Sequence, residues 1–137
     1  MQQGLLESAQ RDPAAAATFQ AANALAGAAA QRGLFVQGQL AAGFAALERA
    51  DRASALGAFT QALAASAGQA WWQRTSAAVA RLGLASSRPF AQRDQALAEL
   101  TAAIPVFEEA SRITEDSEHR LYLARARARL AELGGPR

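Results

Sequence analysis

The sequence predicts an all-α protein, and two features of its composition and one of its spacing lead to that prediction. Ala is the commonest of the 137 residues, and β-branched residues are scarce. Ala is the best helix former, whereas β-branched side chains lose rotamer freedom in a helix. No segment alternates apolar and polar residues between turn signals, as a half-buried strand does. Large and small apolar residues recur instead at the spacing of a helix face, so we expect helices throughout the chain.

One pattern of small and large side chains recurs at three places about 40 residues apart. Each copy, called a triad below, has a small residue, a large residue four positions later and another small residue three positions after that. The copies are Ala15–Phe19–Ala22, Ala55–Phe59–Ala62 and Ala96–Leu100–Ala103. The large residues are 40 and 41 positions apart, and the tetrapeptide Ala-Gln-Arg-Asp occurs at 9–12 and again at 91–94. A spacing of this kind predicts a repeated structural unit.

Capping and breaking residues divide the first half of the chain into helices. We expect a short opening helix that ends near Arg11, with Asp12 as the N-cap and Pro13 as the first residue of a second helix. Gly33 should end this second helix, because glycine commonly follows the last residue of a helix. A third helix should run from about 34 to 50.

The second half of the chain contains clearer signals. Asp51 should cap a fourth helix, and a fifth should span about 69–85. Pro89 should separate the fifth helix from a sixth, since proline disfavours helix in the residue before it. Pro105 lies inside the sixth helical pattern and predicts a kink or a restart there. With a last helix at about 116–134, the sequence predicts about seven helices.

The second triad resembles the second helix of a tetratricopeptide repeat (TPR). That helix typically has a small residue, an aromatic residue four later and a small residue three after that, as in Ala55, Phe59 and Ala62. Gly43 lies twelve residues before Ala55, where the family often has glycine in its first helix. The resemblance implies one domain, 1–137, built as an antiparallel helix-pair repeat, a TPR-like α-solenoid.

The same resemblance implies approximate units at 1–32, 33–68 and 69–113, followed by a capping helix at 116–134. The period of about 40 residues is longer than the 34 of the family. The tryptophan and the repeat-end proline of the family are not matched. Other paired-helix repeats have periods near 40 residues, and a plain helical bundle is the alternative architecture.

The expected binding residues come from the family's concave face, which the first helices of successive pairs line. Carrying these positions over gives Gln37, Leu40, Phe44 and Leu47 in the second unit, and Trp71, Arg74, Ala78 and Arg81 in the third. Because Arg can bind a carboxylate with two hydrogen bonds and Trp supplies contact area, this set suits a peptide or partner helix with an apolar anchor and a carboxylate. The alternative interpretation places Trp71 or Trp72 in the core.

Nothing in the sequence predicts catalysis, a metal or a cofactor. His119 is the only histidine, and it follows Glu115, Asp116 and Glu118, a cluster that we interpret as the solvated first turn of a helix. No glycine-rich phosphate loop follows a strand, and serine-rich spots such as Ser86-Ser87 have no histidine within reach along the sequence. We therefore predict a non-catalytic protein–protein interaction module.

Charge and cysteine content limit the other classes of function. The net charge is only +2 although the pI is about 10.4, because every basic residue is Arg and almost nothing titrates between the carboxylates and the guanidinium groups. The chain has no Cys, and no apolar run approaches the ~20 residues of a membrane helix. We expect a cytoplasmic protein without a membrane partner. The removal of a signal peptide from a longer precursor remains an alternative.

Two alternatives to a protein or peptide partner remain. The first is a self-associating helical bundle, because the first unit lacks part of its first helix. The second is a nucleic-acid-linked regulatory domain, suggested by Arg125, Arg127 and Arg129. Arg125 and Arg129 share a helix face but Arg127 lies roughly opposite, and no aromatic residues are interleaved with them, so the pattern disfavours nucleic acid.

Overall fold

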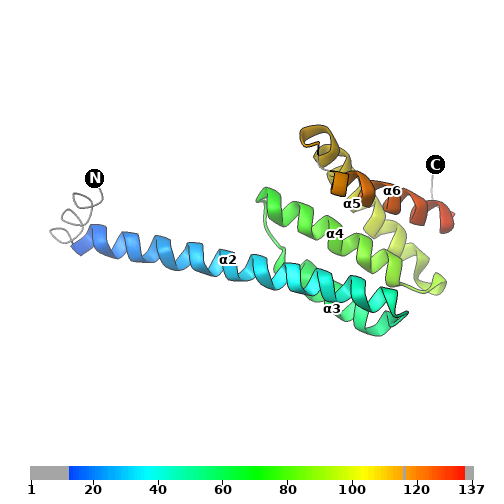
Figure 1. Cartoon of the computed structure of the whole chain (residues 1–137), viewed down its shortest axis with the longest axis horizontal. Coiled ribbons are helices and arrows are strands. Elements are labelled where there is room, and N and C mark those ends of the chain that lie inside the picture. Colours follow the sequence, from blue (N-terminus) through cyan, green and yellow to red (C-terminus); the bar gives the residue numbers. More distant parts are fainter. Residues whose placement is uncertain (1–12, 116, 135–137) are drawn as a thin grey trace. The chain divides into compact units, whose positions relative to one another are not determined.

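The computed structural model describes residues 13–115 and 117–134, which are helical apart from short connections (Figure 1). Its elements are α2 (Pro13–Glu48), α3 (Arg52–Ala65), α4 (Trp71–Ser87), the short 3₁₀ helix η1 (Phe90–Gln92), α5 (Arg93–Ile113) and α6 (Ser117–Glu132). These ranges contain no strand, so the all-α prediction is confirmed. The expected opening helix and the Asp12 N-cap lie outside the described residues.

Six of the seven predicted helices fall within the described residues, which form five α-helices, because the break expected at Gly33 does not occur. A glycine ends a helix when it adopts a left-handed backbone conformation. Among the described glycines, only Gly68 and Gly134 have a positive φ. Gly33 stays inside α2, where an internal glycine costs only about 1 kcal/mol relative to alanine. The prediction that it ends a helix is therefore wrong.

The chain divides into two compact units, with the boundary between Leu34 and Phe35. In the first unit, every described side chain from Ala17 to Arg32 is exposed. The side chains of Ala15 and Phe19, two members of the first triad, are not among those described. The second unit contains the C-terminal part of α2 and the helices α3 to α6, and every feature below lies within it. No helix in the described part of the chain is both long and apolar enough to cross a lipid bilayer.

A tight turn joins α2 to α3. Ala50 has a φ of 58°, a left-handed conformation that reverses the chain, and the N–H of Asp51 donates to the carbonyl oxygen of Ala46 at 2.9 Å. The carboxylate of Asp51 then accepts a hydrogen bond from the N–H of Ser54 at 3.2 Å, which confirms Asp51 as the N-cap of α3. Hydrogen bonds from the side chain and backbone of Ser54 hold the pKa of Asp51 below its usual value.

The two prolines that the sequence marked have different effects. α4 ends at Ser87, two residues before Pro89, as predicted. α5 continues without interruption through Pro105, so the helix does not restart there. Pro105 and Thr101, whose carbonyl loses its helical hydrogen bond to the proline, are both exposed, and water can satisfy that carbonyl.

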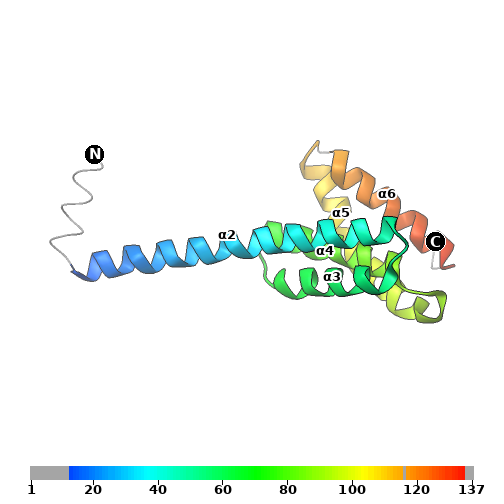
Figure 2. The ribbon, with the colours of Figure 1, turned by 60° about the horizontal axis from the view of Figure 1, so that its bottom comes forward.

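Helix α4 is the centre of the second unit. It packs against α3 and α5, and α6 packs against both α5 and α4. Figure 2 shows α3 running beside the C-terminal part of α2. The buried residues of α4 include many small ones, namely Ser76, Ala77, Ala78, Ala80, Gly83 and Ala85. Because such small side chains extend only a short distance from the helix backbone, neighbouring helices can approach α4 closely on several sides.

The second and third triads both lie in the core. Their six residues, Ala55, Phe59, Ala62, Ala96, Leu100 and Ala103, have no exposed surface. Phe59 and Leu100 are among the largest fully buried side chains in the described chain. The small–large–small pattern therefore identified the buried faces of α3 and α5.

The ring of Phe59 fits between two glycines of neighbouring helices. A Cβ atom added to Gly43 of α2 would lie 2.6 Å from the ring, and one added to Gly83 of α4 would lie 2.3 Å from it. Both distances are far below van der Waals contact. The ring of Phe44 also meets Phe59 edge-on, with the ring centres 5.0 Å apart. Each glycine therefore leaves the space that the Phe59 ring occupies.

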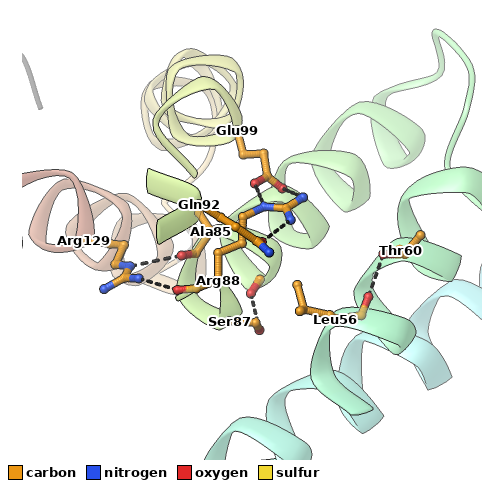
Figure 3. Close-up of polar contacts among 9 residues, drawn as sticks. Leu56, Thr60, Ala85, Ser87, Arg88, Gln92, Glu99 and Arg129 are labelled. Atoms are coloured by element: carbon orange, nitrogen blue, oxygen red, sulfur yellow. Dashed lines mark hydrogen bonds and ion pairs between the residues drawn. The ribbon is translucent and has the colours of Figure 1, made fainter. Parts of the chain in front are cut away.

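Arginine side chains close the C-terminal end of α4 (Figure 3) and that of α6. The guanidinium group of Arg129 donates to the carbonyl oxygens of Ala85 and Arg88, each at 3.0 Å. Arg88 in turn forms an ion pair with Glu99 of α5. Arg93 donates two hydrogen bonds to the carbonyl oxygen of Leu133, at 2.9 and 3.2 Å. These contacts satisfy carbonyl groups that a helix end leaves without an internal partner.

Candidate binding groove

Three helices, α2, α4 and α6, surround two hollows that share the side chain of Phe44. The first hollow has a volume of about 290 Å³. Its lining comes from Gln37, Leu40, Ala41 and Phe44 of α2, from Thr75, Ser76 and Val79 of α4, and from Glu118, His119 and Tyr122 of α6. The second hollow has a volume of about 500 Å³. Its lining comes from Phe44, Leu47 and Glu48 of α2, Leu82 and Ser86 of α4, and Arg125, Ala128, Arg129 and Glu132 of α6. We call the two hollows together the groove.

The four α2 residues predicted to bind a partner all line the groove. Gln37 and Leu40 border the first hollow, Leu47 borders the second, and Phe44 borders both. Gln37 is exposed, whereas Leu40 is only 7% exposed and forms part of the floor. The structure therefore brings this predicted set together on one side of α2.

The four α4 residues of the predicted set do not join them. Arg74 and Arg81 line a separate hollow of about 370 Å³, to which Leu63 of α3 and Val106 of α5 also contribute. Ala78 is fully buried. Trp71 is half-buried beside Arg74, whose guanidinium carbon lies 5.3 Å from the centre of the Trp71 ring. None of the four lines the groove.

A difference of one residue in helical register separates the two sets. Thr75, Val79 and Leu82, three of the α4 residues that line the groove, each follow one of the predicted residues by one position. One residue along a helix turns the side chain by about 100°. The triad Ala78–Leu82–Ala85 of α4 is buried, so Ala78 points into the core, and the period of about 40 residues exceeds the 34 of the family from which the α4 positions were carried over.

Arg74 is engaged within the fold. One of its nitrogens donates to a carboxylate oxygen of Glu109 in α5 at 2.8 Å, with both side chains about a third exposed. Together with its position over the Trp71 ring, this ion pair gives Arg74 two partners inside the same chain. Of the aromatic pair in α4, Trp72 packs against the core.

Tyr122 and His119 of α6 are groove residues that the sequence did not identify as such. The rings of Tyr122 and Phe44 are nearly parallel, at 13°, with their centres 6.3 Å apart. The hydroxyl of Tyr122 donates to the carboxylate of Glu118 at 2.8 Å. His119 is half-buried, and its Nδ1 atom is buried without a hydrogen-bond partner. A sequence signal existed, because positions 118, 119 and 122 share one face of a helix.

The two hollows differ in charge. Glu118 is the only carboxylate and no arginine is present among the residues lining the first hollow. The second hollow has two carboxylates, Glu48 and Glu132, and two arginines, Arg125 and Arg129. Arg129 also holds the end of α4, as described above, and forms an ion pair with Glu132 at 3.0 Å. The groove thus combines an apolar floor with a negative group at one end and mixed charge at the other.

Metal ligation has no support in the part of the chain that the structure describes, where no three His, Asp or Glu side chains are grouped as a metal would require. No family model, curated protein or solved structure matches this chain.

Proposed function

We propose that this chain is a non-catalytic protein–protein interaction module, and that its groove binds a peptide or a partner helix. The observation that carries the proposal is the lining of the groove by α2, α4 and α6, while α3 and α5 bury their triads and support those helices. An apolar floor with a polar rim is the usual anatomy of a protein interface.

The paired-helix arrangement of the TPR family agrees with this proposal. Gly43 and Gly83 are 40 residues apart, and both contact Phe59. Phe59 and Leu100, 41 residues apart, are both fully buried. On this interpretation the C-terminal part of α2 pairs with α3, α4 pairs with α5, and α6 is the capping helix. The first helices of the pairs then face the ligand. A cytoplasmic location fits the absence of cysteine from the chain.

A pair of arginine substitutions tests the groove. Ala41 is exposed and lines the first hollow, so Ala41→Arg places a long side chain in the groove without disturbing the core. Ala42 is equally exposed but lines none of the three hollows described above, and Ala42→Arg is therefore the matched control. The measurement is affinity capture of partners from a lysate of the native organism, followed by mass spectrometry. A partner retained by the wild type and Ala42→Arg but lost with Ala41→Arg supports the proposal. Equal capture by both variants contradicts it.

Self-association is a second candidate, favoured by the first unit. Between Ala14 and Gln31 the sequence has no charged residue, and the described side chains of this segment are exposed. A helix of this composition gains stability when a second helix covers it. Sedimentation velocity of the full chain distinguishes the two candidates. A protein that is still monomeric at about 100 μM, where even weak specific dimers form, contradicts self-association.

A further inference from the structure

We propose that the first hollow of the groove receives a basic side chain, Arg or Lys, from the bound partner. This inference rests on the proposed function, because it names the residue type that the groove recognises. The sequence alone suggested the opposite chemistry, a carboxylate bound by Arg74 and Arg81. Those two arginines line a different hollow, so they are not available to a ligand in the groove.

The walls of the first hollow suit the apolar stem of a long basic side chain. Leu40, Phe44 and Val79 contribute apolar surface from two helices. Lys and Arg bury their methylene groups along such surface while the charged end reaches a polar partner. A volume of about 290 Å³ lies at the lower limit for small-molecule pockets, which is a size suited to one side chain.

The aromatic pair favours a cation over an anion. The parallel rings of Phe44 and Tyr122 both border the hollow. The face of an aromatic ring carries negative partial charge and attracts an ammonium or guanidinium group within about 6 Å. A carboxylate gains nothing from the same faces.

The polar groups at the α6 side complete the match. Glu118 supplies the only carboxylate of the lining, and the hydroxyl of Tyr122 holds it by a hydrogen bond of 2.8 Å. A carboxylate forms charge-assisted hydrogen bonds with Arg and Lys, and it repels another carboxylate. His119 is close by in the same turn and also lines the hollow. Arg has five N–H donors and Lys has three, so either can donate to the Glu118 carboxylate.

His119 and Tyr122 make the test direct, because they are the only histidine and the only tyrosine of the chain. Each therefore gives a single set of ring proton signals in a ¹H NMR spectrum. The full chain is titrated at constant ionic strength with four probes of similar size: butylguanidinium, butylammonium, butyramide and butyrate. We expect saturable shifts of the His119 and Tyr122 signals with the two cations, and binding of butyrate weaker by at least about tenfold, the effect of roughly 1.4 kcal/mol.

Two variants and a control define the role of the carboxylate. Glu118→Gln keeps the shape and removes the charge, and it should weaken butylguanidinium binding by about tenfold, since the hydrogen bond is no longer assisted by charge. Tyr122→Phe keeps the ring and removes the hydrogen bond to Glu118, and it should weaken binding less. Glu115→Gln is the control, because Glu115 is exposed and does not line the hollow. Circular dichroism of each variant checks that the fold is retained.

Three results would overturn the inference: no saturable shift with either cation, butyrate binding as tightly as butylguanidinium, or Glu118→Gln binding the cation like the wild type. Each is distinguishable from failure of the proposed function. If Ala41→Arg still abolishes partner capture while the hollow ignores cations, the groove binds a partner through other side chains. If capture is insensitive to Ala41→Arg, the proposed function itself fails.

Discussion

The two helix hairpins of the second unit, Phe35–Ala65 and Trp71–Ile113, carry the same triad but pack and close differently. In the first hairpin the large residue is Phe59, and glycines on two neighbouring helices make room for its ring. In the second it is Leu100, which is equally buried although none of the described glycines has it as a close neighbour. A triad thus predicts which helix face is buried, while the size of its large residue determines where glycines are needed.

The turns of the two hairpins are also stabilised by different kinds of contact. The first is closed by the backbone, through the left-handed Ala50 and the hydrogen bonds of Asp51. The second is closed by side chains, through Arg88 and Arg129 (Figure 3). A short backbone turn tolerates few residue types, whereas the side-chain closure depends on arginines that lie 41 residues apart in sequence.

Removing the two large residues should have the largest effect. Phe59→Ala should lower the free energy of unfolding by about 3–5 kcal/mol, and Leu100→Ala by about 2–5 kcal/mol, because each leaves a cavity in the core. Urea denaturation followed by circular dichroism measures both. A loss below about 1 kcal/mol for Phe59→Ala would mean that α2 and α4 close over the space, contrary to the rigid fit described here.

Filling the space beside Phe59 should also destabilise the protein. Gly83→Ala places a methyl group against the ring and should cost about 1–3 kcal/mol, the usual penalty of an overpacked core. Gly57→Ala is the control, because no atom lies within 4 Å of the added Cβ, and alanine should stabilise α3 by about 0.5–1 kcal/mol. Phe59→Leu in the Gly83→Ala background should recover part of the loss. If Gly83→Ala and Gly57→Ala behave alike, the contact with Phe59 is not what selects glycine.

The side-chain closure of the second hairpin should respond to Arg129. Arg129→Ala leaves the carbonyl groups of Ala85 and Arg88 without their partner and should cost about 1–3 kcal/mol. Arg127→Ala should cost less than about 0.5 kcal/mol, since its ion pair with Glu108 is exposed. Thermal unfolding of the two variants side by side gives the difference. Equal melting temperatures would show that Arg129 does not stabilise the end of α4.

The backbone closure of the first hairpin should be improved by glycine. Ala50 has a left-handed conformation that costs an L-residue roughly 1–2 kcal/mol and costs glycine little. Ala50→Gly should therefore raise the free energy of unfolding by up to about 1 kcal/mol, as the flexibility of glycine in the unfolded chain offsets part of the gain. A lower stability in urea would indicate that the turn is not under strain.

The smallest expected effect is a dependence on pH at the cap of α3. Because the pKa of Asp51 is lowered in the folded protein, its contribution to stability is present above its unfolded pKa and is lost as pH falls through the folded value, that is, below about pH 4. Asp51→Asn removes this contribution while keeping a side chain that can cap the helix. The free energies of unfolding of the wild type and Asp51→Asn, measured in urea, should therefore differ above about pH 4 and become similar below it.

The sequence predicted the helical class, the Asp51 cap, the break at Pro89 and the buried faces of α3 and α5, because each depends on local propensity or on helical spacing. It failed at Gly33, since a glycine ends a helix only in a left-handed conformation, which depends on the residues around it. Of the binding residues that it predicted, those in α2 line the groove and those in α4 do not, because a shift of one residue rotates a whole helix face. The contact between Tyr122 and Phe44 at the polar end of the groove could not be predicted from the sequence, because the two residues are 78 positions apart.

The central position of α4 has a consequence for how the second unit opens. Its small residues are covered by α3, α5 and α6 together, and the ring of Phe59 fits against its glycine. The backbone amides of its buried residues, from Ser76 onward, therefore cannot reach solvent by fraying of a single neighbouring helix. They should exchange with deuterium only when the unit unfolds as a whole, which makes α4 the most strongly protected segment and the core of one cooperative folding unit.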